Sequence, residues 1–203
     1  MRQEYTIYLR GFEERDAEQI NKWRNDRNIQ ALVSAPFRYV PLAIEKEWVR
    51  SKMLENRRDI YLAVCLKEDD RMIGYVSINN IDHINRTAFG GGVVLDREYQ
   101  DGFIRHEVGM LIRELAFDHL NLNRFEGRCL AAHRTSRILM EACGYKLEGV
   151  LREAVYKDGA YHDQCVYSLL RKDYYEMMAN GQYTLKVFAR KIKEIRKKED
   201  DKI

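Results

Sequence analysis

The pattern of apolar and polar positions changes its period along the chain, and each change marks a new expected element. Residues 5–12, "YTIYLRGF", alternate between the two kinds, which predicts a first strand. Residues 14–26 then carry acidic side chains early and place Ala17, Ile20 and Trp23 on one face at helical spacing. This part of the chain therefore predicts a strand that leads into an amphipathic helix.

A loop and a second helix come next. Residues 34–41, "SAPFRYVP", hold both prolines of the chain, and proline interrupts helices and strands, so this segment is an expected loop. Residues 42–56 return to a helical period, with Ile44, Trp48 and Met53 as the expected apolar face.

A block rich in β-forming residues follows the second helix. Strands are expected over 59–66, 72–81 and 87–96, separated by the polar turns "KEDDR" and "DHINR". The third strand contains three consecutive glycines at 90–92. Glycine inside a strand often marks a bulge or the close approach of another backbone or a ligand. The other interpretation is a flexible strand end, and the sequence leaves both open.

The second half of the chain predicts two further helices and three further strands. An amphipathic helix is expected over 103–120, a strand over 123–131, and a short helix over 134–143 that ends at Gly144, a residue suited to a left-handed cap. Two strands joined by the turn "KDGA" form an expected hairpin over 145–170. This mixed order of helices and strands predicts an α+β sandwich with helices on both faces of the sheet.

Residues 176–203 differ in pattern from the first domain, which we place at 1–175. Lysine and arginine crowd most faces of a predicted helix here, and four apolar residues share one stripe. The four are Leu185, Phe188, Ile192 and Ile195. We expect an added basic helix that docks by this stripe, either in cis or across a homodimer, with a disordered tip beyond about Lys197.

Composition narrows the class of protein. With 203 residues, 45% of them hydrophobic, the chain has enough apolar side chains for one domain with an appendage. The net charge of +3 is too small to indicate nucleic acid. No apolar run is long enough for a membrane span or a signal peptide. The four cysteines are far apart and form no CxxC pair, which favours reduced thiols in a cytoplasm and no metal site.

Four segments in this order resemble a known family. They are "YLRGFEERDAEQINKWRND", "INNIDHINRTAFGGGVVLDREYQ", "AFDHLNLNRFEGRCLAAHRTS" and "ACGYKLEGVLREAVYKDGAYHDQCVYSLLRKDY", and together they cover about residues 5–175. They resemble the GNAT N-acetyltransferases, with closer similarity to the ribosomal-protein-alanine and spermidine acetyltransferase branch. The resemblance implies a mixed sheet, acetyl-CoA as donor and a primary amine as acceptor: a protein N-terminus, a polyamine or an amino sugar.

The resemblance also implies where acetyl-CoA binds. The backbone of Val93, Val94 and Leu95 would pair with the pantetheine arm in a wedge between two strands. The amides of the next loop would hold the pyrophosphate. That loop contains Gln100, Asp101, Gly102, Phe103, Ile104 and Arg105. The physics supports this role, because the first-turn N–H groups of a helix have no intrahelical partner and carry partial positive charge.

The chain departs from the family pattern in this loop. Phe103 and Arg105 stand where the family has glycines, which let phosphate approach bare backbone. Two interpretations are open for Phe103: its ring fills the space of the pyrophosphate, or the loop still binds the pyrophosphate. Two are also open for Arg105: its guanidinium binds a phosphate, or it lies at the surface of the helix. We therefore interpret the loop as degenerate.

Two further departures follow the next strand. His133 replaces a family asparagine that contacts the cofactor, and it keeps hydrogen-bonding capacity. Met140 replaces a tyrosine that protonates the leaving thiolate in many relatives. Ser136 is a candidate substitute, and the other interpretation is that it caps or packs the helix.

The chemistry needs a base, because a lysine-type amine with a pKa of about 10.4 is mostly charged at neutral pH. Glu126 in the predicted strand is our candidate, and the other interpretation is a strand carboxylate paired with arginine. The oxyanion needs a donor, for which we name an amide of Val94 or Leu95.

Two other hypotheses remain open from the sequence. One is a GNAT-fold protein that no longer holds acetyl-CoA and serves binding or regulation. The other is a changed acyl donor, or ribosome contact through the basic C-terminal helix.

Overall fold

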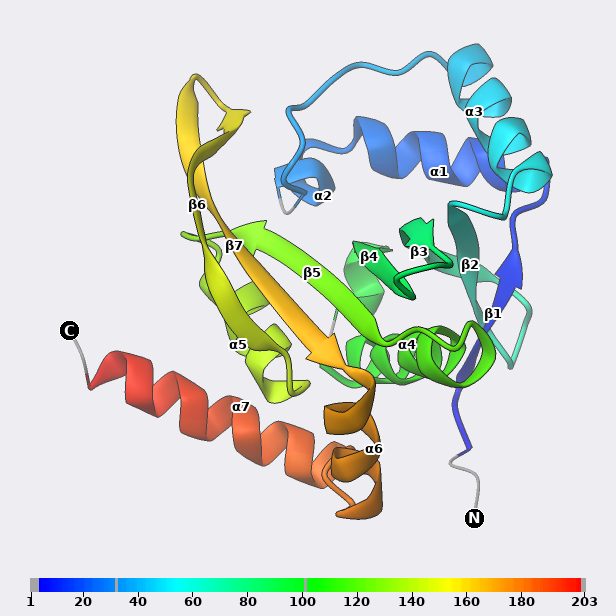
Figure 1. The fold of residues 1–203 in the computed structure, drawn as a ribbon. Coiled ribbons are helices and arrows are strands. Elements are labelled where there is room, and N and C mark those ends of the chain that lie inside the picture. Colours follow the sequence, from blue (N-terminus) through cyan, green and yellow to red (C-terminus); the bar gives the residue numbers. More distant parts are fainter. Residues whose placement is uncertain (1–3, 32, 101, 202–203) are drawn as a thin grey trace.

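The computed structural model describes residues 4–31, 33–100 and 102–201 (Figure 1). Its strands are β1 (Ile7–Gly11), β2 (Ile60–Leu66), β3 (Met72–Asp82), β4 (Thr87–Leu95), β5 (Arg124–Leu130), β6 (Lys146–Lys157) and β7 (Ala160–Leu170). Its α-helices are α1 (Asp16–Asn25), α2 (Arg27–Ala31), α3 (Leu42–Leu54), α4 (Gly102–Glu114), α5 (Arg134–Ala142), α6 (Arg171–Ala179) and α7 (Leu185–Asp200). A 3-10 turn, η1 (Arg97–Tyr99), precedes α4, and a π turn, η2 (Leu115–His119), continues it.

The strands form one mixed sheet in the order β1-β2-β3-β4-β5-β7-β6. Neighbouring strands are antiparallel except β4 and β5, which run parallel. A parallel pair needs a crossover between its strands, and α4 with η2 supplies it. The predicted mixed sheet and GNAT-like order of elements are confirmed.

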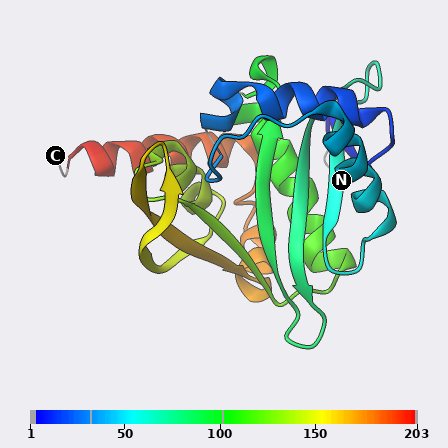
Figure 2. The same cartoon turned by 90° about the horizontal axis from the view of Figure 1, so that it is seen from above.

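Helices cover both faces of the sheet, as Figures 1 and 2 show. Helices α1 and α3 pack on one face through a core that includes Ile20, Trp23 and Val49. Helix α4 packs on the opposite face through a larger core that includes Val108 and Phe117. We call these the α1 face and the α4 face. Helix α5 lies on the α4 face too, behind β5, β7 and β6 (Figure 1).

The predicted apolar face of the first helix is confirmed. For the second helix, Trp48 packs against the core as predicted, whereas the placement of Ile44 and Met53 on that face is wrong. In α3, Ile44 is 59% exposed and Met53 is 39% exposed, whereas Glu45 and Val49 are buried. The Arg24 guanidinium lies 2.8 Å from Glu45 and stacks on the Trp48 ring, so a paired carboxylate takes a core position. Periodicity counts apolar residues and does not detect this pairing.

The C-terminal helix docks in cis. Phe188 of α7 is buried, and its ring centroid lies 4.7 Å from that of His106 in α4. The His106 ring also contacts the Tyr183 carbonyl through Nε2, at 2.8 Å. Helix α7 continues to Asp200, so the expected disordered tip beyond Lys197 is wrong for residues 198–200. The proposed boundary at residue 175 lies inside α6, and a separate C-terminal unit stays a prediction.

The four cysteines are free thiols, and Cys65, Cys129 and Cys165 are buried. Burial raises the pKa of Cys129 to about 11. Among the described residues, no helix combines the length and apolar character that a membrane crossing requires. A cytoplasmic location and the absence of a metal stay predictions.

Candidate active site

The parallel strands β4 and β5 separate along their length. They pair only where residues 87–89 meet residues 124–126. Beyond that point β4 continues against β3, with Val94 opposite Tyr75, while β5 continues against β7. In the described part of the chain, the edge of β4 from Gly90 to Leu95 has no strand pairing toward β5. A seam therefore opens toward the carboxyl ends of the two strands.

The glycines at 90–92 form a bulge where the seam opens. Val76 pairs with Val93 and Ile78 with Gly90, so two β4 residues oppose one residue of β3. Gly92 has a φ of +90°, in the left-handed region that favours glycine. Of the two interpretations that the sequence left open at 90–92, the structure shows the bulge.

The same bulge brings side chains of β3 close to the backbone of β4. A Cβ on Gly91 would lie 2.0 Å from Ser77 Oγ and 2.5 Å from Asn79 Nδ2. Asn79 Oδ1 is buried and accepts no hydrogen bond among the described residues. The sequence did not identify Ser77 or Asn79; their alternation in "SIN" on a strand was the available signal.

Two helix N-termini face the open end of the seam. Helix α4 begins at Gly102 soon after β4, and α5 begins at Arg134 soon after β5. Because β4 and β5 are parallel, both helices start at the same edge of the sheet, where α/β folds bind ligands. A Cβ on Gly102 would meet no atom within 4 Å, so space is open beside the first turn of α4.

Hydrogen bonds fix the loop before α4. The side-chain amide of Gln100 donates to the Leu95 carbonyl at 3.1 Å, and Arg105 Nε donates to the Gln100 carbonyl at 3.0 Å. Ile104 is buried in the core of the α4 face. Phe103 is 39% exposed and belongs to neither core. Asp101 lies outside the described residues.

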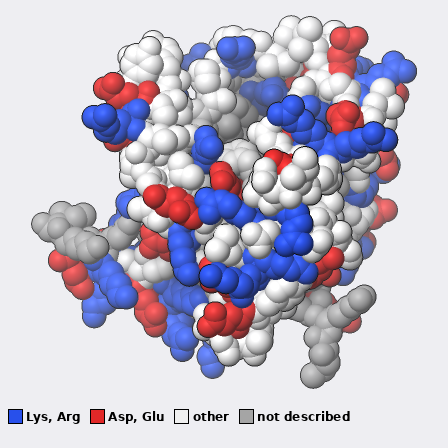
Figure 3. All heavy atoms as spheres, viewed as in Figure 1, with Lys and Arg blue, Asp and Glu red and all other residues white. Residues whose placement is uncertain are grey.

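On the α1 face, polar side chains of β5 lie at the seam. We call Arg124, Glu126 and Arg128 the floor of the seam. Phe125 points into the α4-face core, so Glu126 projects to the α1 face. Arg124 Nε lies 2.9 Å from Glu126, and Arg128 lies 3.9 Å from it while stacking over the Phe89 ring. The floor borders a cavity of about 280 Å³ lined by Asn80, Thr87, Ala88, Phe89, Glu126 and Arg128. Figure 3 shows this side of the molecule hollowed between the β6–β7 arm and the α1-face helices.

The elements that form the seam lie within a segment that matches a known enzyme family. Residues 6–146 match the acetyltransferase (GNAT) domain family. The chain belongs to the GNAT acetyltransferases.

Its similarity to individual proteins is moderate. The ribosomal-protein-serine acetyltransferase of Escherichia coli (strain K12) is 32% identical over 117 residues, which are 57% of this chain and 64% of that enzyme. The uncharacterized N-acetyltransferase p20 of Bacillus licheniformis is 28% identical over 170 residues, 83% of this chain and 94% of that protein. A crystal structure of spermidine N-acetyltransferase from Vibrio cholerae, in complex with CoA and spermine, superposes with a TM-score of 0.76 at 24% identity, covering 84% of this chain and 98% of that one.

Family membership makes this protein an N-acetyltransferase with acetyl-CoA as co-substrate. The residues at the seam fit that molecule. The unpaired edge at Val93, Val94 and Leu95 offers backbone groups to the pantetheine amides, and the first turn of α4 offers partial positive charge to the pyrophosphate. The open space beside Gly102 leaves room for a phosphate near the backbone. The roles of the individual residues stay predictions.

In the acetyltransferase, His133 and Ser136 lie together at the start of α5. His133 is the N-cap, and its Nδ1 accepts a hydrogen bond from the Ser136 backbone N–H at 3.2 Å. Met140 packs behind β5, where a Cβ on Gly127 would lie 2.5 Å from its Cε. The Ser136 hydroxyl keeps both of its interpretations.

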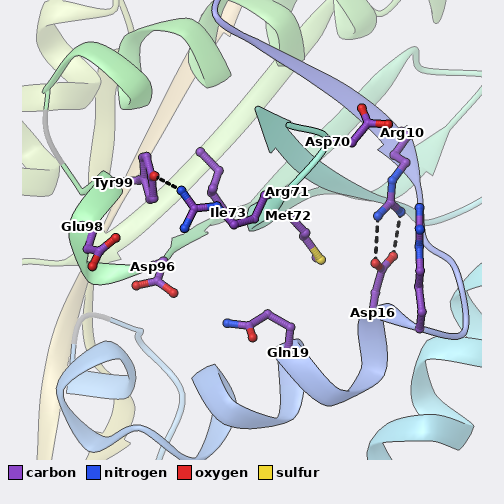
Figure 4. Close-up of a pocket in the computed structure, with 11 residues that line it drawn as sticks. Arg10, Asp16, Gln19, Asp70, Arg71, Met72, Ile73, Asp96, Glu98 and Tyr99 are labelled. Carbon is purple, nitrogen blue, oxygen red and sulfur yellow. Dashed lines mark hydrogen bonds and ion pairs between the residues drawn. The ribbon is translucent and has the colours of Figure 1, made fainter. Parts of the chain in front are cut away.

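A larger cavity of the acetyltransferase, about 510 Å³, lies away from the seam (Figure 4). Its walls come from β1, α1, the β2–β3 turn, the start of β3 and the η1 segment, and its described lining includes no residue of β5 or α5. Most charged groups there are already engaged: Arg10 forms two hydrogen bonds with Asp16, and Asp70 accepts one from Tyr8. We assign the chemistry to the seam, where the unpaired edge of β4 and the first turn of α4 fit acetyl-CoA.

Proposed function

We propose that this acetyltransferase transfers an acetyl group to the α-amino group at a protein N-terminus, with ribosomal proteins as the first candidates. The observation that carries the proposal is the charge balance of the floor. Glu126 is paired with Arg124 and Arg128, and Glu148 accepts from Arg124 at 2.8 Å. Within this group of described side chains, two carboxylates are matched by two guanidinium groups, so the group carries no surplus negative charge to attract a polyamine.

The acidity of the acceptor supports the same choice. An α-amino group has a pKa of about 7.7–8.0, so roughly a tenth of it is neutral at pH 7, against less than about a thousandth of a lysine-type amine. An α-amine therefore demands less of the base.

In this proposal the two sides of the seam have separate tasks. Backbone amides of β4 and α4 hold acetyl-CoA, which supplies the activated acetyl group. An N–H of Val94 or Leu95 stabilises the negative charge that develops on the acetyl oxygen. Glu126, directly or through water, accepts the proton that the amine loses. Ser136 or a water gives a proton to the departing thiolate.

The experiment is a comparison of acceptors with the purified chain. Peptides that match the N-termini of ribosomal proteins are compared with spermidine and an amino sugar as acceptors. The rate is measured as CoA release, and acetylation of each acceptor is confirmed by mass spectrometry of the product. The matched control is each peptide with a blocked N-terminus and a free lysine. We expect acetylation of the free α-amine; a higher kcat/KM for spermidine than for every peptide contradicts the proposal.

A ligand titration separates this proposal from loss of cofactor binding. Acetyl-CoA that binds the folded state raises the thermal unfolding midpoint. No shift at millimolar acetyl-CoA, together with no product, favours the binding or regulatory alternative.

A further inference from the structure

The tip of the β6–β7 hairpin is fastened to a helix that is remote in sequence. Lys157, the last residue of β6, is 5% exposed. Its Nζ donates to the carbonyl oxygens of Gln30, Ala31 and Val33 at 3.1, 2.9 and 2.6 Å. These partners lie 127, 126 and 124 residues away in sequence. The hairpin arm and the α2 segment are thus joined across the molecule by one side chain.

The chemistry of the contact is specific. A lysine ammonium carries three N–H donors, and three carbonyls accept them here. These carbonyls belong to the last residues of α2 and the segment after it, where helix carbonyls have no intrahelical partner and the helix dipole favours a cation. A charged group is buried only at a cost unless it is satisfied in this way. An apolar side chain would fill the space without ordering α2 at its end.

The other end of α2 is fastened toward the donor side. Asp26 accepts from the backbone N–H of Asn28 at 2.8 Å, which caps α2, and from Arg97 at 2.9 Å. Arg97 belongs to η1, the turn just before the cofactor loop. Helix α2 is therefore held at both ends. Its N-terminal end contacts η1, the turn that follows β4, and its C-terminal end contacts Lys157.

Helix α2 and the β6–β7 hairpin lie on either side of the hollow on the α1 face. Figure 1 shows α2 above the carboxyl end of β5, with the outer part of the arm curving toward it. Figure 2, the view from above, shows the α2 region and the arm next to each other. Glu126 and Arg128 of the floor belong to β5, the strand next to β7 in the sheet. An amine that approaches the seam from the α1 face would therefore pass between α2 and the hairpin.

We propose that Lys157 is a positioning residue for the amine acceptor. By fastening the hairpin tip to α2, it fixes the width of the passage above Glu126 and so decides how well an acceptor is held against the seam. In the proposed function acetyl-CoA binds through β4 and α4, whereas the Lys157 ammonium bonds to the end of α2 and the segment after it. The inference rests on the proposed function of the seam as the amine site and adds the residue that shapes its entrance.

The test is a steady-state comparison of Lys157→Met with the parent chain. The acceptor is the peptide with the highest kcat/KM in the comparison of acceptors. Met keeps the apolar stem and removes all three donors. We expect the KM for the amine to rise about tenfold, since charged hydrogen bonds are lost, while the KM for acetyl-CoA stays within about twofold. A purely structural role would lower the unfolding midpoint and the amount of active enzyme without separating the two KM values.

Two further variants keep the test decisive. Lys146→Met is the matched control, because Lys146 lies on the same strand and its side chain is 72% exposed. Lys157→Gln retains two N–H donors without charge and should raise the KM for the amine less than Lys157→Met does. If Lys157→Met does not fold, Lys157→Gln against Lys146→Met decides. An unchanged KM for the amine in the folded Lys157 variants overturns the proposal.

Failure of the proposed acceptor gives a different result. If the parent chain acetylates spermidine and not peptides, the α-amine assignment fails, and the Lys157 comparison is made with spermidine. If the parent chain acetylates no amine and binds no acetyl-CoA, the amine passage itself is rejected, and this inference fails with it.

Discussion

The two sides of the seam are built by different means. On the donor side, the unpaired edge of β4 and the first turn of α4 present backbone groups, and their positions follow from strand and helix geometry. On the acceptor side, side chains form the floor and the walls, and their contacts join segments far apart in sequence. Lys157 reaches α2 across more than 120 residues, while Gln100 reaches only back to Leu95.

This difference indicates where substitutions matter. A backbone site is lost when the strand geometry changes, and it tolerates new side chains that leave the backbone in place. A site built from side chains can be lost when a substitution removes a single polar atom. On the donor side, space is open beside Gly102 although the next residue, Phe103, carries a large side chain. Substitutions on either side of the seam test this contrast.

Gly91→Val should damage the donor side most. The new Cβ would lie 2.0 Å from Ser77 Oγ, so either the bulge or β3 must move. We expect a loss of about 1–3 kcal/mol in the free energy of unfolding, together with loss of acetyl-CoA binding. Thermal unfolding with and without acetyl-CoA measures both. Gly11→Val is the control, because a Cβ there meets nothing within 4 Å. Normal acetyl-CoA affinity in Gly91→Val would refute a backbone-built site.

Glu126→Gln should damage the acceptor side with little change in binding. The amide cannot take a proton from the amine, so we expect kcat to fall about 100-fold while the KM for acetyl-CoA stays near that of the parent. Initial rates over a range of both substrates measure this. Glu148→Gln is the matched control, because Glu148 binds the same Arg124. A fall of less than about threefold would leave Glu126 as an ordinary paired carboxylate.

Phe103→Gly and Arg105→Met sharpen the contrast on the donor side. Removing the Phe103 ring brings bare backbone to the first turn, so we expect the KM for acetyl-CoA to fall about threefold. Removing the Arg105 charge should raise that KM by a similar factor if the guanidinium binds phosphate. Neither change should alter the KM for the amine. Equal effects on both substrates would show that the loop belongs to both sides.

Asp26→Ala should give the smallest effect, in the pH dependence of stability. Burial acts against ionisation of Asp26, but the hydrogen bonds from Arg97 and two backbone amides dominate and lower its pKa below the ordinary 3.8. The ionised carboxylate therefore stabilises the fold above that pH, and this contribution is lost as the pH falls through the folded pKa. Asp26→Ala should cost about 1 kcal/mol at pH 7 and less between about pH 5 and pH 3.

Thermal unfolding midpoints across this range measure the effect. Asp26→Asn is the matched variant, because it keeps a side-chain cap for α2 and loses only the charge. A constant difference between Asp26→Ala and the parent chain at every pH would show that ionisation of Asp26 has no part in it.

Local patterns in the sequence predicted the elements around the seam well. Alternation and helical spacing are properties of neighbouring residues, and they located the strands and the start of α4 near Gly102. The glycines at 90–92 left a bulge and a flexible strand end both open, and the structure shows the bulge. The cap at Gly144 has a φ of +87°, as its position after a short helix predicted.

The acceptor side was less predictable, because pairs remote in sequence decide it. Glu45 has a charged side chain and yet is buried, since Arg24 pairs with it. Even so, its burial raises the pKa of that carboxyl. Lys157 stands in a turn-like "KDGA" and gave no sign of its contact with α2. Helix α2 itself has only five residues, too few for a periodic signal.

The thiols of this chain have a consequence for measurement. CoA released in each turnover is a free, exposed thiol, whereas Cys65, Cys129 and Cys165 are enclosed and burial raises the pKa of each. A dye that reacts with thiolates will therefore count product over a background from the folded protein that comes mainly from the half-buried Cys143. A sudden extra signal from the same cuvette would mark enzyme that has unfolded, so one trace separates slow catalysis from a lost fold.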